Sequence, residues 1–224
     1  MKFPRALLVC AMLLPSLGAL MYFVLFSQSA WANELYLAAK VAMVVLGVVG
    51  WRSGVLRFKN ALPVARKEIA RGLLVGALLA LSIFAAAFLF WDTLLLSRAE
   101  ILEKITSLVP LAWYGVVAIV FSIFHTLFEE WYWRGYVART LGIYVRPSSA
   151  IILGALAFTG HHVIVLSQMF PWHIVALGSF GVFCGGVIWS LLLKKTSFLT
   201  ASWISHICVD LAIFFMGFLL VAGV

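Results

Sequence analysis

Three apolar segments of the sequence carry side chains that could do chemistry. They hold Glu129, Glu130 and Arg134 in one segment, Phe158 and His162 in the next, and His206 and Asp210 in the last. An ionisable group inside a bilayer costs several kcal/mol unless it is paired or faces an internal cavity. The ionisable residues of these segments therefore indicate a functional site.

Helical spacing suggests how these residues divide their roles. Glu130 and Arg134 lie four residues apart, on one helix face, and are expected to form an ion pair. Glu129 points about 100° away from that pair, which makes it the candidate general base. His206 and Asp210 are also four apart, so Asp210 is expected to accept a hydrogen bond from His206 and fix its tautomer.

Two hydrolytic chemistries fit these residues. In the first, Glu129 with His162 activates a water that attacks a peptide carbonyl, while His206 and Asp210 stabilise the oxyanion. In the second, Glu129, His162 and His206 hold a zinc ion with an open coordination position. The sequence has no His-Glu-x-x-His helix, the direct signature of a zinc protease. Both chemistries end in peptide hydrolysis.

Each residue also has a purely structural interpretation. Glu130 with Arg134 could be an architectural ion pair, and His206 with Asp210 could join two helices. His161 faces about 100° away from His162 and is expected to be a neighbour rather than a participant. The occurrence of such groups in three separate spans favours a functional site.

Two other classes of protein remain open. A proton- or ion-coupled transporter would use Glu, His and Asp as a relay across the bilayer, although no repeat typical of many transporters is visible. A non-catalytic membrane scaffold would keep the same residues as a buried polar network. An activity assay separates the scaffold from the enzyme.

The composition predicts how these residues are held. Of 224 residues, 65% are hydrophobic and 11% are charged, whereas soluble domains have about 25% charged residues. A helix needs about 20 apolar residues to cross a bilayer. We therefore expect an all-α, polytopic transmembrane bundle, a single membrane domain over residues 1–224. The predicted spans, about seven, are 6–27, 35–51, 72–96, 108–130, 148–170, 174–193 and 198–221.

Residues near the spans follow the same logic. Trp131, Tyr132 and Trp133 are expected to form an aromatic belt at the membrane interface, with a wall of the substrate site as the alternative. The three cysteines, Cys10, Cys184 and Cys208, lie in apolar stretches without metal-type spacing and are expected to be inert.

The positive charges predict an orientation. The net charge is +8, but the sixteen Lys and Arg residues lie between apolar segments and do not form a nucleic-acid footprint. In a seven-span arrangement nearly all of them fall on one side, which the positive-inside rule makes cytoplasmic. We expect a cytoplasmic N-terminus, an outer C-terminus, a retained first span, the lipid bilayer as a partner and no nucleic acid.

The three segments resemble the CAAX protease and bacteriocin-processing family, abbreviated CPBP, of Abi-type intramembrane peptidases. That family is marked by Glu-Glu-x-x-x-Arg, Phe-x-x-x-His and His-x-x-x-Asn or Asp in separate helices, and the motifs stand here in that order. The resemblance covers roughly residues 108–215, the expected catalytic core.

The resemblance implies an endopeptidase in which Glu129 activates water with help from His162. His206 and Asp210 would stabilise the oxyanion, and Glu130, Arg134 and Phe158 would give structural support. It favours a glutamate-dependent enzyme without a cofactor and leaves zinc as the alternative. The expected substrate is a membrane-associated or lipid-linked protein or peptide, and the expected location is a bacterial inner membrane.

Asp210 departs from the Asn that many members of the family carry at this position. It adds a negative charge and leaves open whether this carboxyl donates a proton, orients His206 or binds a metal.

Overall fold

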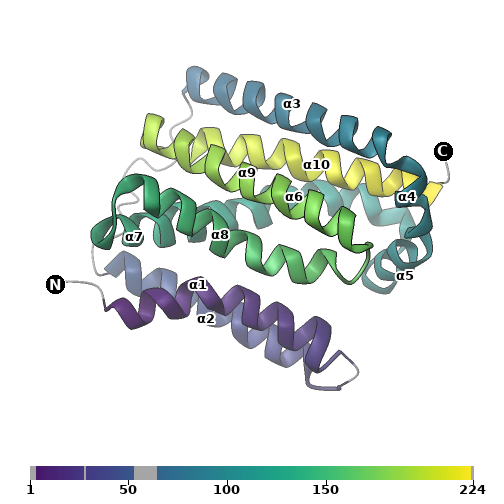
Figure 1. The fold of residues 1–224 in the computed structure, drawn as a ribbon, viewed down its shortest axis with the longest axis horizontal. Coiled ribbons are helices and arrows are strands. Elements are labelled where there is room, and N and C mark those ends of the chain that lie inside the picture. The colour runs from purple at the N-terminus through teal and green to yellow at the C-terminus, as the bar shows by residue number, and fades with distance from the viewer. Residues whose placement is uncertain (1–3, 28, 53–64, 223–224) are drawn as a thin grey trace. The chain divides into compact units, whose positions relative to one another are not determined.

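The computed structural model describes residues 4–27, 29–52 and 65–222, and every regular element in these ranges is a helix (Figure 1). Seven helical segments are long and apolar enough to cross a membrane. They are Arg5–Leu25, Ala32–Arg52, Arg66–Leu89, Leu111–Tyr144, Pro147–Leu166, Trp172–Thr196 and Thr200–Ala222. The predicted all-α bundle of about seven spans is therefore confirmed.

The spans are built from α-helices with short π-helical and 3-10 segments. In chain order the elements are α1 (Arg5–Leu20), η1 (Met21–Leu25), α2 (Ala32–Arg52), α3 (Arg66–Leu89), α4 (Trp91–Leu96), α5 (Arg98–Leu108), η2 (Leu111–Trp113), α6 (Tyr114–Glu129), η3 (Glu130–Ala138), α7 (Arg139–Tyr144), α8 (Pro147–Leu166), α9 (Trp172–Thr196) and α10 (Thr200–Ala222).

The fourth span differs most from its predicted range of 108–130. The helix continues through Glu130 as the π-helix η3 and then as α7, so that it ends at Tyr144. The prediction took the charges at Glu130 and Arg134 as the end of the span. These two side chains are 0% and 2% exposed, so they lie inside the protein and do not end the helix.

The third span was also predicted with the wrong end. The range 72–96 joins the end of α3 to the separate helix α4, and the break falls at Phe90, where φ is −113° and ψ is 20°. Asp92 lies two residues after this break, but the prediction kept this single charge within the span because apolar residues stand on both sides of it.

Local sequence accounts for several helix ends. α7 ends before Arg146, whose extended ψ of 149° is the conformation preferred before a proline. Pro147 then occupies the first turn of α8, where its missing N–H costs nothing. α9 ends with Lys194 and Lys195 in its last turn, which complement the helix dipole.

The helices group into two compact units. Unit 1 is Met1–Ala61 with Glu130–Leu199, and unit 2 is Leu62–Glu129 with Thr200–Val224. Glu129 and Glu130 are consecutive residues of one continuous helix, which passes from unit 2 to unit 1 at this point. The single functional membrane domain expected from the sequence stays a prediction.

Unit 1 is built on the packing of α8 against α9, with α1 against α8 and α2. Small residues let these helices approach closely, as is usual in membranes. A Cβ on Gly186 of α9 would lie 3.1 Å from the Cβ of Ala155 on α8, and one on Gly18 of α1 would lie 2.8 Å from Ala39 on α2.

Unit 2 is built on α3 and α10, which pack along their length. A Cβ on Gly76 of α3 would lie 2.8 Å from the Sγ of Cys208. Cys208 thus packs against α3.

Two side-chain hydrogen bonds join α10 to α6 in unit 2. Trp203 Nε1 donates to the carbonyl of Ile123 at 3.0 Å, and the Tyr114 hydroxyl donates to the carbonyl of Phe214 at 2.8 Å. They fix the position of α10 along the axis of α6 and so set which residues of the two helices face each other.

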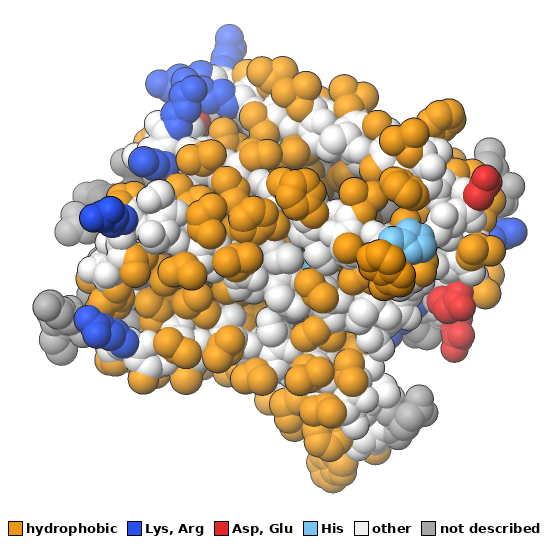
Figure 2. Space-filling model, in the orientation of Figure 1, with side chains coloured by type: hydrophobic (Ala, Val, Ile, Leu, Met, Phe, Trp, Pro, Cys, Tyr) orange, Lys and Arg blue, Asp and Glu red, His pale blue; other side chains and the backbone are white. Residues whose placement is uncertain are grey.

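The surface of the spans is apolar. Figure 2 shows hydrophobic side chains over most of the visible face. Large apolar residues such as Phe88 and Leu74 are 82% and 64% exposed. Such exposure suits helices whose solvent is lipid rather than water.

Candidate active site

Glu129 lies in a cluster of buried polar side chains within unit 2. Its Oε2 atom is 3.7 Å from Nε2 of His206 on α10, and its Oε1 atom is 3.7 Å from Nε2 of His125 on α6. Asp210 Oδ1 is also 3.7 Å from Nε2 of His206. Glu129 and His206 are 4% and 3% exposed. The structure therefore brings together three of the predicted site residues, Glu129, His206 and Asp210.

At 3.7 Å these contacts are longer than hydrogen bonds, which need donor and acceptor within about 3.2 Å, and they are ion pairs only when His206 is protonated. Asp210 was expected to accept a hydrogen bond from His206 and fix its tautomer. In the structure Asp210 and Glu129 both approach the same nitrogen, Nε2. His206 Nε2 is thus the point at which the two carboxylates meet.

Unit 1 contains the predicted ion pair. Glu130 Oε1 lies 3.2 Å from Arg134 Nη1, with both side chains buried. The guanidinium carbon of Arg134 stands 4.3 Å from the ring centre of Phe158 and 4.9 Å from that of Trp189. The pairing predicted from the spacing is therefore present, and Phe158 contacts it directly.

Phe158 also contacts the histidines of α8. Its ring centre is 4.6 Å from that of His162 and 5.6 Å from that of His161. The Nδ1 atom of His162 is 2.9 Å from the carbonyl oxygen of Phe158. Because a carbonyl only accepts, Nδ1 carries the hydrogen in this contact, and in neutral His162 the acceptor atom is Nε2.

His161 stacks on a buried tryptophan of unit 1. Its ring is parallel to the indole of Trp133, with an interplanar angle of 2° and ring centres 5.8 Å apart. Trp133 and Tyr132 are 2% and 0% exposed. The aromatic belt predicted for these two residues is therefore wrong, because both pack inside unit 1.

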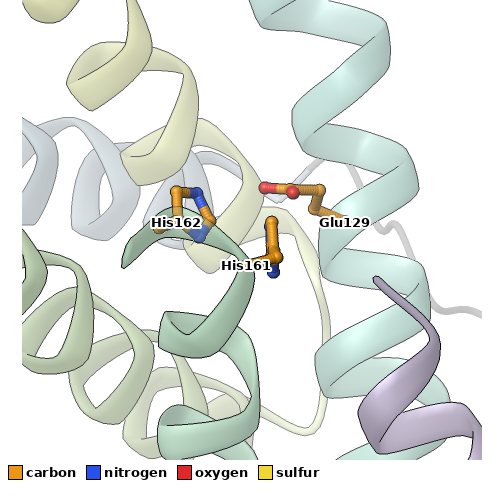
Figure 3. A group of neighbouring side chains, drawn as sticks. All are labelled: Glu129, His161 and His162. Atoms are coloured by element: carbon orange, nitrogen blue, oxygen red, sulfur yellow. The ribbon is translucent and has the colours of Figure 1, made fainter. Parts of the chain in front are cut away.

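Three residues drawn in Figure 3 carry side chains of the kinds that bind zinc. Glu129 of unit 2 offers a carboxylate, and His161 and His162 of unit 1 offer imidazole nitrogens. The zinc alternative from the sequence, with Glu129, His162 and His206 as ligands, stays a prediction.

Sequence reasoning missed His125 and gave His161 no role. Both residues carried a signal that could have found them. His125 lies four residues before Glu129, and His161 directly precedes His162.

The fold and these clusters define a multi-pass, all-helical membrane protein with carboxylates and imidazoles buried in its spans. Residues 110–212 match the family described as Rce1-like, type II CAAX prenyl endopeptidase. The resemblance to the CAAX protease family is therefore confirmed over this region, which contains all seven predicted site residues. Comparisons with curated proteins and with solved structures gave no match.

Proposed function

We propose that this protein is an intramembrane endopeptidase that hydrolyses a peptide bond in a membrane-associated or lipid-linked protein or peptide. The proposal is supported by the CAAX-protease-type region at residues 110–212. The observation that carries it is the buried Glu129 carboxylate, which has an imidazole 3.7 Å from each of its two oxygens.

Glu129 acts as the general base in the proposed mechanism. It takes a proton from a water held between it and His162, and the resulting hydroxide attacks the peptide carbonyl. Glu129 then returns the proton to the leaving amine. Proton transfer by a positioned side chain contributes about 100- to 10,000-fold to rate.

His206 and Asp210 stabilise the negative charge that develops on the carbonyl oxygen. A protonated Nε2 on His206 donates to that oxygen, and Asp210 holds the imidazole cation. Removing one such donor typically costs about 100- to 1,000-fold in kcat. Glu130, Arg134 and Phe158 keep the helix that carries Glu129 in place.

A zinc enzyme is the alternative within the same function. Glu129, His162 and His206 would hold the ion, which would polarise the carbonyl and ease deprotonation of water. Metal analysis of the purified protein separates the two mechanisms, because stoichiometric zinc that is needed for cleavage would exclude the glutamate-only mechanism.

The first prediction tests Glu129 itself. Glu129→Gln keeps the shape of the side chain but removes the base, so cleavage should fall by about 100- to 10,000-fold. The measurement is cleavage of a panel of membrane-anchored peptides, prenylated and unprenylated, by the protein in proteoliposomes. Size-exclusion profile and helical content should stay unchanged.

Glu103→Gln is the matched control, because Glu103 is an exposed carboxylate on α5. It should cleave like the unmodified protein. Undiminished cleavage by Glu129→Gln would contradict the proposed function. Proton flux into vesicles that depends on Glu129, without cleavage, would favour a transporter instead.

A further inference from the structure

His125 is a residue of α6 that lies outside the three sequence motifs. It stands one helical turn before Glu129, and its Nε2 atom is 3.7 Å from Glu129 Oε1. The other oxygen, Oε2, faces Nε2 of His206 at the same distance. The carboxylate of Glu129 is thus held between two imidazoles, one from its own helix and one from α10.

The ring of His125 has a fixed orientation. It stacks on Phe121, one turn earlier on α6, with ring centres 4.3 Å apart and an interplanar angle of 16°. Phe121 in turn meets Phe214 of α10 edge to face, at 5.9 Å and 85°. Because this stack holds the ring, Nε2 points to one place, which is the Oε1 side of Glu129.

Within the described part of unit 2, two helices supply the ionisable groups of this cluster. On α6 the neighbour of Glu129 is His125, and on α10 the groups are His206 and Asp210. α3, which packs on α10, has no ionisable side chain between Gly72 and Leu89. His125 shares a helix with Glu129 and therefore moves with it.

A general base must present one defined oxygen to its water. A carboxylate can rotate about its last bond, and rotation exchanges its two oxygens. If one oxygen is held by an imidazole, the other is left in a constant position. A displacement of about 1 Å in a catalytic group can cost about 100-fold in rate.

We propose that His125 is a positioning residue that holds Oε1 of Glu129, so that Oε2 is presented to the water that Glu129 deprotonates. This inference rests on the proposed peptidase function. It adds a residue that the three motifs do not contain, and it assigns different tasks to the two oxygens of the base.

The test compares two substitutions of His125. His125→Phe keeps a flat ring to stack on Phe121 but has no nitrogen for Glu129. His125→Gln loses the ring but places an amide N–H near the position of Nε2. Because a positioning role needs the N–H, kcat should fall about 10- to 100-fold in His125→Phe with KM unchanged, and His125→Gln should recover most of it.

The opposite pattern would overturn the proposal. If His125→Phe is active and His125→Gln is not, the ring serves packing alone. His173→Phe is the matched control, because His173 is an exposed histidine at the start of α9, and it should leave kcat unchanged.

A second measurement does not depend on turnover. The midpoint of thermal unfolding in detergent is compared for His125→Phe, Glu129→Gln and the double variant. If His125 contacts Glu129, the effect of His125→Phe should shrink in the Glu129→Gln background. Full additivity would contradict the contact, even if one variant were too unstable to assay.

The proposed peptidase function and the positioning role of His125 can be overturned separately. If Glu129→Gln is inactive but His125→Phe matches the unmodified protein, only the role of His125 is wrong. If Glu129→Gln cleaves normally, the proposed function fails and the role of His125 fails with it.

Discussion

Arg134 illustrates, at the scale of single residues, how a charge is stabilised inside a membrane span. Its guanidinium pairs with Glu130 at 3.2 Å and lies over the rings of Phe158 and Trp189. The ion pair and the cation–π contacts offset part of the cost of burying both charges. Phe158 belongs to the second sequence motif, and its ring thus helps to stabilise the charge of Arg134 in the first motif.

Removing Arg134 should be severely destabilising. Arg134→Met leaves the Glu130 carboxylate buried without its partner, which costs about 3–5 kcal/mol. The free energy of unfolding in detergent is the measurement. Arg134→Met combined with Glu130→Gln should be less destabilised than Arg134→Met alone, because no charge is then left uncompensated.

Arg146→Met is the control for Arg134, since Arg146 is exposed before the start of α8. It should change stability by less than about 0.5 kcal/mol. Equal losses in the two arginine variants would contradict a special role for the buried pair.

Asp210 is the second residue with a specific prediction. If its role is to hold His206, an amide can replace it, because the amide oxygen of Asn can accept a hydrogen bond from the imidazole as a carboxylate does. Asp210→Asn should keep cleavage within about 10-fold, while Asp210→Leu should lose about 100- to 1,000-fold. Rates of peptide cleavage check both values, and an inactive Asp210→Asn would show that the carboxylate itself is needed.

The π-helix η3 is the most informative feature at the scale of elements. It begins at Glu130, directly after Glu129, and π-helical turns inside α-helices are frequent at functional sites. The hydroxyl of Tyr132 donates to the carbonyl of Ala11 on α1 at 2.7 Å. A Cβ on Gly50 of α2 would lie 2.5 Å from the ring of Tyr136. Within unit 1, α1 and α2 therefore pack around η3 and support it.

The packing of α3 on α10 gives a prediction at the same scale. A Cβ on Gly72 would lie 2.8 Å from the backbone oxygen of Ala201, which cannot move away without shifting α10. Gly72→Ala should therefore destabilise the protein by about 1–3 kcal/mol. Thermal unfolding in detergent measures the loss.

Gly115→Ala serves as the matched glycine control in the same unit. Nothing lies within 4 Å of a Cβ at Gly115, so this substitution should be neutral or slightly stabilising through helix propensity. If both glycine variants behave alike, the close approach of α3 and α10 is not what Gly72 provides.

The distribution of charge is the main feature at the scale of the whole molecule. In unit 1, Arg5 lies over the ring of Tyr144 at 5.2 Å, Arg146 precedes α8, and Lys194 and Lys195 end α9. A short connection at residues 167–171 joins α8 to α9, so the start of α8 and the end of α9 fall on one side of the unit. The positive-inside rule makes this side cytoplasmic, and we propose this orientation for the protein in a bacterial inner membrane.

Cysteine labelling tests the orientation. In a variant without Cys10, Cys184 and Cys208, a cysteine at Gln168 should react with a membrane-impermeant maleimide in intact cells. A cysteine at Ser148 should react only after the membrane is opened. Both positions are exposed at the ends of α8. The reverse pattern would show the opposite orientation.

The sequence by itself determined the class of the protein and one of the contacts among its candidate site residues. Composition alone required lipid as the solvent, and apolar length predicted about seven spans. Spacing of four residues predicted the pair Glu130–Arg134, because neighbours on one helix face are set by helix geometry. That geometry is local, so no knowledge of the fold was needed.

Only the tertiary structure decided what lies around Glu129 and how far its helix runs. The contact of Glu129 with His206 depends on how α10 packs against α6, which the hydrogen bonds of Trp203 and Tyr114 set across 80 and 100 residues of chain. Tyr132 is buried and η3 continues to α7 because other helices pack around it. Hydropathy depends only on the local sequence. It therefore cannot distinguish a charged residue that ends a span from one that a neighbouring helix buries.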